Sequence, residues 1–370
     1  MPPPYTSQAI AQALQARLIG DANLLVSRVV HPAAAQNERD LVLAVDPKLV
    51  HLLAKTPARV GVVSSDAELE PGLLDACIVV DRPRLAMAKL SALFAIPVTV
   101  ALGIHPSAVI EPGAKLGEKV RIGPFVYVGS EAEIGDECQL HPHAYVGQEA
   151  KLGAGTILNS GVRIGADVTL GERCLVHFNA SIGADGFSFV TPEKGSVEQA
   201  KESGASETSA RNSRLERIAS LGAVEIGNDV EIGANTSIDR GTIASTKIGN
   251  GTKIDNQVQV GHNVIIGENC LICGRVGIAG SVEIGNRVVL GGATGVADHV
   301  KIGDDAIAMA MSAIAGNVPP HAVVGGIPAA PREKTMENLF NISRIKHLIK
   351  KVDALAERLD ILQRKGPEVP

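Results

Sequence analysis

An apolar residue returns at every sixth position through most of the chain beyond residue 103. One run covers 104–182, a short one covers 226–238, and a third covers 248–302, so the register breaks across 184–223 and again after Ile238. In most units Gly follows the apolar residue directly. Neither an amphipathic helix nor a coiled coil has a period of six.

Six-residue units predict a parallel β-helix, in which three units make one triangular coil. The β-branched residue of each unit would point inward, and Gly would lie where the backbone turns the corner. Stacked coils would pair at the interstrand spacing of roughly 4.8 Å. Each coil would bury its apolar residues only against its neighbours, which spreads stability along the stack. We therefore predict a mainly β fold.

The flanking segments predict two further parts. Residues 1–103 indicate a small α/β domain, with helices at 8–18, 47–55 and 83–94 and strands at 41–45, 60–64 and 77–81. The β-helix would occupy 104–331 with an inserted loop at 184–223, whose middle, 193–214, is rich in Ser, Glu and Lys and is typical of a mobile loop. Residues 332–370 predict a C-terminal helix.

That helix carries apolar residues alternately three and four apart, a seam of the coiled-coil kind. The residues are Ile345, Leu348, Val352, Leu355, Leu359 and Leu362. A seam this short is marginal alone, so we expect it to join subunits already held by their β-helices. A trimer fits the triangular coil. Basic residues beside the seam could meet an acidic protein, although solvated helix charges are the commoner explanation.

Composition excludes several classes of function. The net charge of −5 leaves no basic surface for nucleic acid. No apolar run reaches the roughly 18–20 residues of a membrane span, and the N-terminus has no secretory signal pattern. Five cysteines, an odd number, indicate reduced thiols and a cytoplasmic location. Three of them, Cys138, Cys174 and Cys270, fall on inward positions, so we expect them to be structural.

The candidate chemistry gathers around His262. Asp255 takes a corner position that Gly usually fills, and Asn256 follows it. One coil is eighteen residues, so the backbone of Gly280 should stack one coil after His262, and His299 should follow on the same edge. A neutral imidazole can accept a proton near pH 7, and a fixed peptide N–H can stabilise an oxyanion. These are the groups that acyl transfer to an amine needs.

Several short motifs carry a resemblance over essentially the whole chain. They are GADGF at 183–187, IDRG at 238–241, IDN at 254–256, GHN at 261–263, AGS at 279–281 and GGA at 291–293. With them, the sequence resembles the UDP-3-O-(3-hydroxyacyl)glucosamine N-acyltransferase family of the lipid A pathway. The resemblance implies a left-handed β-helix and a cytoplasmic homotrimer with sites between subunits. It also implies lipid biosynthesis without a metal or a resident cofactor.

The resemblance further implies substrates and roles. The donor would be a 3-hydroxyacyl chain on the phosphopantetheine of acyl carrier protein, and the acceptor the 2-amino group of UDP-3-O-acylglucosamine. His262 would be the base, the Gly280 amide would hold the oxyanion, and His299 would help to orient substrate. Substrate contacts would come from Asp255, Asn256, Asn263, Asp185 and Phe187.

One segment departs from the family pattern. The family holds uracil with an aromatic residue, an Asn and a Tyr, where this chain has Leu43, Asp46 and Leu49. Loss of the stacking partner would cost about 1 kcal/mol. Uridine recognition would therefore be weaker, differently placed or directed at another nucleotide, or the three residues are ordinary strand and helix positions.

Three other functions stay open. A related hexapeptide acyltransferase would use acyl-CoA and a different nucleotide-linked amino sugar. A carbonic-anhydrase-like solenoid would need three histidines converging on zinc between subunits, and we do not expect His141 and His143 to converge in this way. A sugar-binding or structural solenoid would have no catalytic base.

Overall fold

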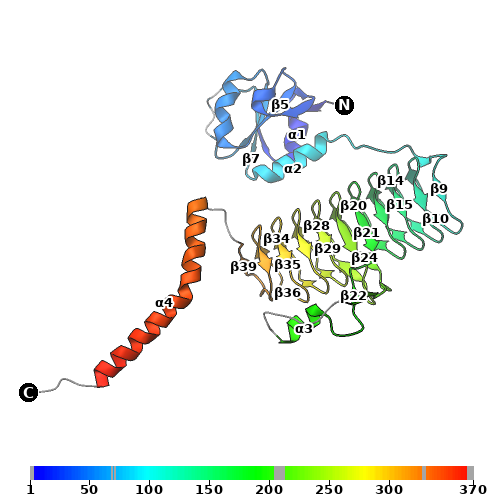
Figure 1. Cartoon of the computed structure of the whole chain (residues 1–370). Coiled ribbons are helices and arrows are strands. Elements are labelled where there is room, and N and C mark those ends of the chain that lie inside the picture. The colour runs from blue at the N-terminus through cyan, green and yellow to red at the C-terminus, as the bar shows by residue number, and fades with distance from the viewer. Residues whose placement is uncertain (1–3, 68–69, 71, 204–212, 327–330, 365–370) are drawn as a thin grey trace, which may run out of the picture. The chain divides into compact units, whose positions relative to one another are not determined.

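The computed structural model describes residues 4–67, 70, 72–203, 213–326 and 331–364 (Figure 1). It divides the chain into two compact units, Met1–Thr99 and Val100–Pro370. The first unit is a small α/β domain, and the second contains a long parallel β-helix and a C-terminal helix. The predicted fold class, a hexapeptide β-helix with an α/β domain before it and a helix after it, is confirmed.

The α/β unit is built on a five-stranded sheet. Its order is β2 (Arg17–Gly20), β7 (Ala76–Val80), β6 (Val60–Ser64), β5 (Asp40–Ala44) and β4 (Arg28–Val30), with β2 antiparallel to β7 and the other neighbours parallel. A small second sheet pairs β1 (Tyr5–Thr6) with β3 (Leu25–Val26). The helices are α1 (Ser7–Leu14), α2 (Pro83–Phe94) and the 3-10 helices η1 (Pro32–Ala34) and η2 (Pro47–Lys55).

Alternating side chains of β5 enter two separate cores in this unit. Leu41 packs in the cluster that includes residues of α1 and α2, whereas Val42 packs in the cluster that includes Leu53 of η2. This alternation is the period of two expected of a strand covered on both faces. The predicted helix at 8–18 is wrong in its second half: α1 ends at Leu14, and Arg17–Gly20 pairs with β7 instead.

The β-helix has three flat faces made of short parallel strands. Face I contains β8 (Gly103–Ile104), β11 (Arg121–Ile122), β14 (Gln139–Leu140), β17 (Ile157–Leu158), β20 (Leu175–Val176), β25 (Glu231–Ile232), β28 (Lys253–Ile254), β31 (Leu271–Ile272), β34 (Val289–Leu290), β37 (Ile307–Ala308) and β39 (Val323–Val324). Its register, Lys253 opposite Leu271, shows the eighteen-residue coil.

The two other faces repeat the same geometry. Face II contains β9 (Val109–Ile110), β12 (Tyr127–Val128), β15 (Tyr145–Val146), β18 (Arg163–Ile164), β21 (Ser181–Ala184), β26 (Ser237–Asp239), β29 (Gln259–Val260), β32 (Gly277–Ile278), β35 (Gly295–Val296) and β38 (Ala313–Ile314). Face III contains β10 (Lys115–Leu116), β13 (Glu133–Ile134), β16 (Lys151–Leu152), β19 (Thr169–Leu170), β24 (Val224–Ile226), β27 (Thr246–Ile248), β30 (Ile265–Ile266), β33 (Glu283–Ile284) and β36 (Lys301–Ile302).

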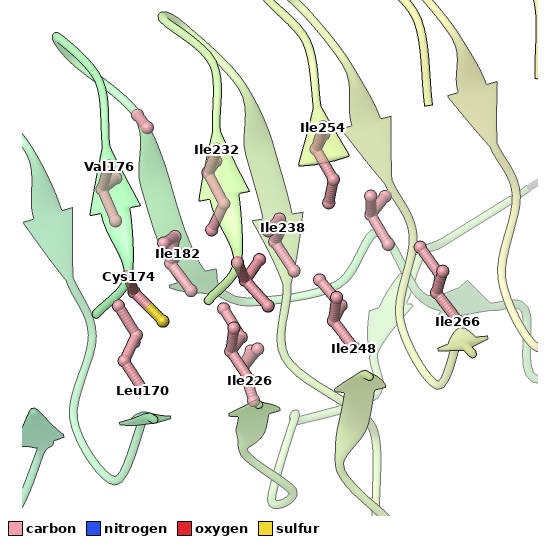
Figure 2. Packing of buried hydrophobic residues seen from close by; sticks show 14 of the residues in the cluster. Leu170, Cys174, Val176, Ile182, Ile226, Ile232, Ile238, Ile248, Ile254 and Ile266 are labelled. Atoms are coloured by element: carbon pink, nitrogen blue, oxygen red, sulfur yellow. The ribbon is translucent and has the colours of Figure 1, made fainter. Parts of the chain in front are cut away.

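The residues of the predicted ladder fill the interior of this prism. Figure 2 shows Val176, Ile232 and Ile254 stacked in successive coils, with Ile182 and Ile238 stacked beside them. Each is at most 2% exposed, so each such side chain contributes about 1.5–3 kcal/mol of burial free energy. Cys138, Cys174 and Cys270 are also buried, as predicted, and burial raises the pKa of the Cys138 thiol to about 11.

The corners follow a different rule from the one predicted. Gly147 has an ordinary φ, but a Cβ added to it would lie 2.6 Å from the amide nitrogen of Ala166 in the next coil. The left-handed residue is Glu149, two positions later, with φ of 58°. Close stacking of coils, rather than backbone conformation, therefore explains why Gly occupies this corner position.

The insertion between β21 and β24 is partly ordered. It contains a hairpin of β22 (Phe189–Val190) and β23 (Glu216–Arg217) and a helix, α3 (Ser196–Ser203). The prediction of a loop across 193–214 is therefore wrong for the α3 segment, and 204–212 lie outside the described residues. Ser181 pairs with Ser237, so the coil resumes in register after the insertion.

The C-terminal helix, α4 (Arg332–Arg364), was predicted as a helical tail. Its seam residues Ile345, Leu348 and Val352 are exposed, as are Leu355 and Leu359. Leu362 is helical, but its side chain lies outside the described part of the chain. None of the helices within the described ranges combines the length and the hydropathy required of a bilayer-spanning segment.

Candidate active site

The hairpin of the insertion lies against the edge between faces II and III. A Cβ added to Gly186 would lie 2.7 Å from the Cβ of His262, and the Gly186 amide donates to Ser220 Oγ at 3.1 Å. Phe187 and Phe189 meet edge to face at 5.1 Å between ring centroids. The sequence places this turn close to the histidine because Gly186 has no side chain to separate them.

A cavity lies between the hairpin and this edge. Its wall is formed by Asp185, Gly186, Phe187, Phe189, Arg217, Asp239, Gln259, Gly261, His262, Ile278, Ala279 and Gly280. Four of the predicted site residues, Asp185, Phe187, His262 and Gly280, therefore come together here. Asp185 lies 3.9 Å from the guanidinium of Arg217, whose Cζ lies 4.7 Å from the ring centroid of Phe189.

Asn263 fixes the orientation of the His262 ring. Asn263 Nδ2 donates to the Ala244 carbonyl at 2.8 Å, and its Oδ1 accepts from the Thr242 amide at 3.0 Å. The same Oδ1 lies 3.0 Å from His262 Nδ1, so Nδ1 is the nitrogen that carries hydrogen in the neutral ring. Nε2 is then a free acceptor, which is the state a general base requires. Asn263 thus orients the base in this chain.

Gly280 borders the free nitrogen of that ring. It follows His262 by one coil, as the register of Val260 opposite Ile278 requires. A Cβ added to Gly280 would lie 2.8 Å from both Cε1 and Nε2 of His262. Among the described residues no hydrogen-bond acceptor is found for the Gly280 amide, whereas the next amide, Ser281, donates to the His262 carbonyl at 2.9 Å. A base and an unused peptide N–H therefore adjoin the cavity.

His299 continues the same edge one coil further on. Its amide donates to the Gly280 carbonyl at 3.2 Å, and its side chain is exposed. It does not form part of the cavity wall around His262. The order His262, Gly280, His299 along one edge is the order that the eighteen-residue period predicts.

Asp255 and Asn256 lie on a different edge, between faces I and II. Asp255 Oδ1 accepts from the Asn256 amide at 2.7 Å, and Asn256 Oδ1 accepts from the Ala234 amide at 2.6 Å. They line a second cavity with His177, Phe178, Glu231, Gly233, Ala234, Lys253, Ile254, Leu271, Ile272 and Cys273. Face II separates this cavity from His262, so one chain does not bring all of the predicted site residues together.

The predicted nucleotide residues have structural positions in the α/β unit. Leu43 and Leu49 are partly buried hydrophobic residues, each packed against one of the two cores. Asp46 caps η2, because its Oδ1 accepts from the Lys48 amide at 2.9 Å. These contacts match the alternative that the three residues are ordinary strand and helix positions.

The wall residues that sequence reasoning missed include Asp239, Gln259, Phe189 and Arg217. The sequence analysis gave Asp239 no role, although it belongs to the IDRG motif. Its carboxyl is half-buried, and burial is the main reason why its pKa lies above the ordinary value. Its corner position could have been noticed, since Gly or Ala stands there in the neighbouring coils. Nothing in the local sequence shows that Phe189 and Arg217 return to this edge.

Metal ligands are not assembled in the described part of the chain. No group of three or more His, Cys, Asp or Glu side chains there is placed to hold a metal ion. His177 Nε2 instead lies 3.0 Å from Glu231 Oε1, and His143 stacks on Phe125 with 5.2 Å between ring centroids.

Comparison with known proteins identifies chains that resemble this one. The bacterial transferase hexapeptide (six repeats) model matches residues 113–148 and 245–280, and the second stretch includes His262 and Gly280. A UDP-3-O-acylglucosamine N-acyltransferase of Ruegeria pomeroyi is 46% identical over 226 residues, covering 61% of this chain and 62% of that protein, a little less than two thirds of its length. One of Paracoccus denitrificans is 45% identical over 276 residues, covering 75% of each chain. UDP-3-O-acylglucosamine N-acyltransferase 1 of Francisella tularensis subsp. holarctica is 35% identical over 122 residues, covering 32% of this chain and 35% of that protein.

Proposed function

Because the chain belongs to the UDP-3-O-acylglucosamine N-acyltransferase family, we propose that it moves a 3-hydroxyacyl chain from acyl carrier protein to the 2-amino group of UDP-3-O-acylglucosamine in lipid A biosynthesis. The observation that carries this proposal is that His262 Nε2 and the Gly280 amide, which has no acceptor among the described residues, adjoin the same cavity. The reaction places the enzyme in the cytoplasm, where carrier-bound acyl chains are made.

The geometry supports a direct transfer. The amine nitrogen attacks the thioester carbon while His262 Nε2 takes one of its protons. The carbonyl oxygen gains negative charge, which the Gly280 N–H stabilises by a hydrogen bond. As the carbon–sulfur bond breaks, the thiolate leaves and receives that proton from His262. The products are an amide and the free phosphopantetheine thiol, so no resident cofactor or metal is needed. His299 would orient one of the substrates from the adjacent coil.

We propose a homotrimer in which two chains complete each site. Asp255 and Asn256 lie on the edge between faces I and II, whereas His262 lies on the edge between faces II and III. An assembly that sets the first edge of one chain beside the second edge of its neighbour would join the two cavities. Asp255 and Asn256 would then hold the sugar in front of the base, while Asp185, Phe187 and Asn263 act from the base's own chain.

The outward side chains of the faces support this assembly. Face III carries a charged ladder in which Lys115 and Glu133 lie 3.1 Å apart, and Lys301 and Glu283 lie 2.9 Å apart. Face I instead exposes Leu271, Ile307 and Val323. Exposed apolar ladders of this kind mark protein contacts, whereas a charged ladder remains in water.

The donor and the nucleotide would be bound outside the two cavities. Arg344, Lys346 and Lys350 on exposed turns of α4 would suit an acidic carrier protein. Since Leu43 and Leu49 are partly buried against the two cores and Asp46 caps η2, the uracil would have to be held by other groups.

Mass spectrometry of the reaction products tests the function. Incubation of the protein with UDP-3-O-acylglucosamine and 3-hydroxyacyl carrier protein should give an N-acylated sugar nucleotide. A parallel reaction with acyl-CoA tests the related acyltransferase function, which predicts faster product formation from CoA. Absence of N-acylated product with both donors would reject the proposed activity.

A further inference from the structure

Asp239 departs from the pattern of the edge on which the active site lies. It ends β26 and stacks directly before Gly261, because Ile238 pairs with Val260. The coils within the stack place Gly or Ala at this corner position, at Gly129, Gly147, Gly165, Gly261, Ala279 and Ala297, whereas the first coil of the face places Glu111 there. A small residue allows close stacking, so the carboxyl group of Asp239 is an exception that stacking does not explain.

Among the described residues no Lys or Arg forms an ion pair with the Asp239 carboxyl, and the imidazole of His262 is close enough to lower the pKa of that carboxyl. Burial raises the pKa of this carboxyl, and the Gln259 side chain from the next coil lowers it by a smaller amount. The arginine in the same cavity wall and the one next in the chain are engaged elsewhere: Arg217 lies by Asp185 at 3.9 Å, and Arg240 donates to the Gly222 carbonyl at 2.6 Å. A half-buried carboxylate without an ion pair is costly, and it borders the same cavity as His262.

We propose that Asp239 is the residue that selects an amine as the acceptor, by accepting a hydrogen bond from the attacking nitrogen. An amine has two N–H groups. One is needed by the base, His262 Nε2, and the second can donate to the Asp239 carboxylate. A hydroxyl acceptor has only one hydrogen, so after it bonds to the base its oxygen would present lone pairs to the carboxylate.

The same contact assists the reaction itself. As the new carbon–nitrogen bond forms, the nitrogen becomes positively charged until His262 has removed its proton. A carboxylate hydrogen-bonded to that nitrogen stabilises this charge more than it stabilises the neutral amine, so it lowers the barrier as well as selecting the substrate. Gln259 acts as a positioning residue, because it contacts the carboxylate rather than the substrate.

This inference rests on the proposed N-acyl transfer, and binding of two acceptors tests it separately. Calorimetry without donor would compare UDP-3-O-acylglucosamine with UDP-3-O-acylglucose, which has a hydroxyl at the reacting position. The full-length protein should bind the amine at least about tenfold more tightly. Asp239→Ala should weaken amine binding by about ten- to hundredfold, the usual range for a charged hydrogen bond, and change hydroxyl binding by less than about twofold.

Asp305→Ala is the matched control. Asp305 is also an aspartate at a turn of the β-helix, but it pairs with Arg287 at 2.7 Å and lies outside the cavity. It should leave both affinities unchanged. Equal losses for both acceptors in Asp239→Ala, or none for either, would overturn the role of Asp239.

The unmodified protein keeps the inference testable if the variant does not fold. No preference for the amine over the hydroxyl in the unmodified protein would refute amine selection, whatever the variant does. If the unmodified protein forms N-acylated product but shows no such preference, amine selection alone fails. If it forms no product, the proposed function fails first.

Discussion

The imidazole of His262 has one productive orientation, set by a residue on each side. Asn263 fixes Nδ1 through a 3.0 Å contact, and Gly280 leaves space beside Nε2. Replacing either neighbour would alter the base without removing it, whereas replacing His262 removes the proton acceptor. Substitutions at these positions should therefore affect catalysis in graded amounts.

His262→Ala should lower kcat by about 10²–10⁴-fold, the usual contribution of general base catalysis. Product formation measured by mass spectrometry would show the loss, and a melting temperature close to that of the unmodified protein would show that the fold persists. His321→Ala is a suitable control because His321 is 76% exposed near the last coil. An active His262→Ala variant would place the base elsewhere.

Gly280→Ala should reduce kcat by at least about tenfold, because the new Cβ would lie 2.8 Å from His262 Nε2 and push the ring aside. Gly316→Ala is the matched control, since a Cβ there meets nothing within 4 Å. Steady-state kinetics of both variants would separate a displaced base from a general effect of adding a methyl group. Equal activity of the two variants would contradict this positioning of the ring.

Single residues were predictable where the eighteen-residue period applies. The period places Gly280 beside His262 because both lie in regular coils. It gives no information on Arg217, because this residue belongs to an insertion that returns to the edge by a hairpin. Asp255 was expected in the site of His262, although the seven positions between them, about one six-residue unit, move it to another edge of the prism.

At the scale of the structural element, the corner explains which sequence changes a coil tolerates. Gly147→Ala should destabilise the β-helix by about 1–3 kcal/mol, since its Cβ would overlap the backbone of the next coil. Glu149→Gly should be neutral or stabilising within about 1 kcal/mol, because relief of the left-handed conformation is offset by the entropy of Gly. Urea unfolding midpoints of the two variants would test this order, and the reverse order would contradict it.

The α/β unit should be sensitive to acid through Asp40. The Arg28 guanidinium, at 2.6 Å, is the main cause that holds the pKa of Asp40 below its ordinary value, with help from the amides of Gln36 and Asn37. A lowered folded-state pKa stabilises the fold above the unfolded pKa of about 4, and this contribution disappears as the pH falls through the folded value. Hydrogen exchange of residues 28–44 should therefore lose protection below about pH 4.

Asp40→Asn should lose much of that protection already at pH 7, because two amides and a guanidinium lose a charged acceptor, at a cost of about 2–4 kcal/mol. Its protection should then change less with pH than that of the unmodified protein. The exposed Asp66, replaced by Asn, is the control. An unchanged pH dependence in Asp40→Asn would show that other carboxyls govern acid unfolding.

Elements were predictable where one local pattern dominates. The strand at Val60–Ser64 was predicted with its observed bounds because both of its faces are buried. The helix predicted at 8–18 ended early because Arg17–Gly20 gains a strand partner, β7, that lies about sixty residues away in the chain. Tertiary pairing overrode the local helical pattern there, and no local signal reports such a partner.

At the scale of the whole molecule, the three faces of the prism differ in chemistry although they share one repeat. Face III pairs lysines with glutamates, as in Lys247 and Glu225 at 2.9 Å. In its C-terminal coils, face II has small outward residues, Gly277, Gly295 and Ala313. Face I has larger apolar outward residues in the corresponding coils. A small-residue face allows close approach of another backbone or a ligand, so faces I and II are suited to contacts and face III to water.

This asymmetry makes the trimer testable together with the shared site. Ile307→Glu combined with Val323→Glu places two charges on face I, where both side chains are more than 40% exposed in one chain and lie outside the cavity of Asp255 and Asn256. The double variant should sediment as a monomer and lose most acyl transfer, because Asp255 and Asn256 of one chain would no longer face His262 of the next. Thr169→Glu, on face III, should keep both the assembly and the activity. Sedimentation velocity would give the mass, and a fully active monomer would show that each chain holds a complete site by itself.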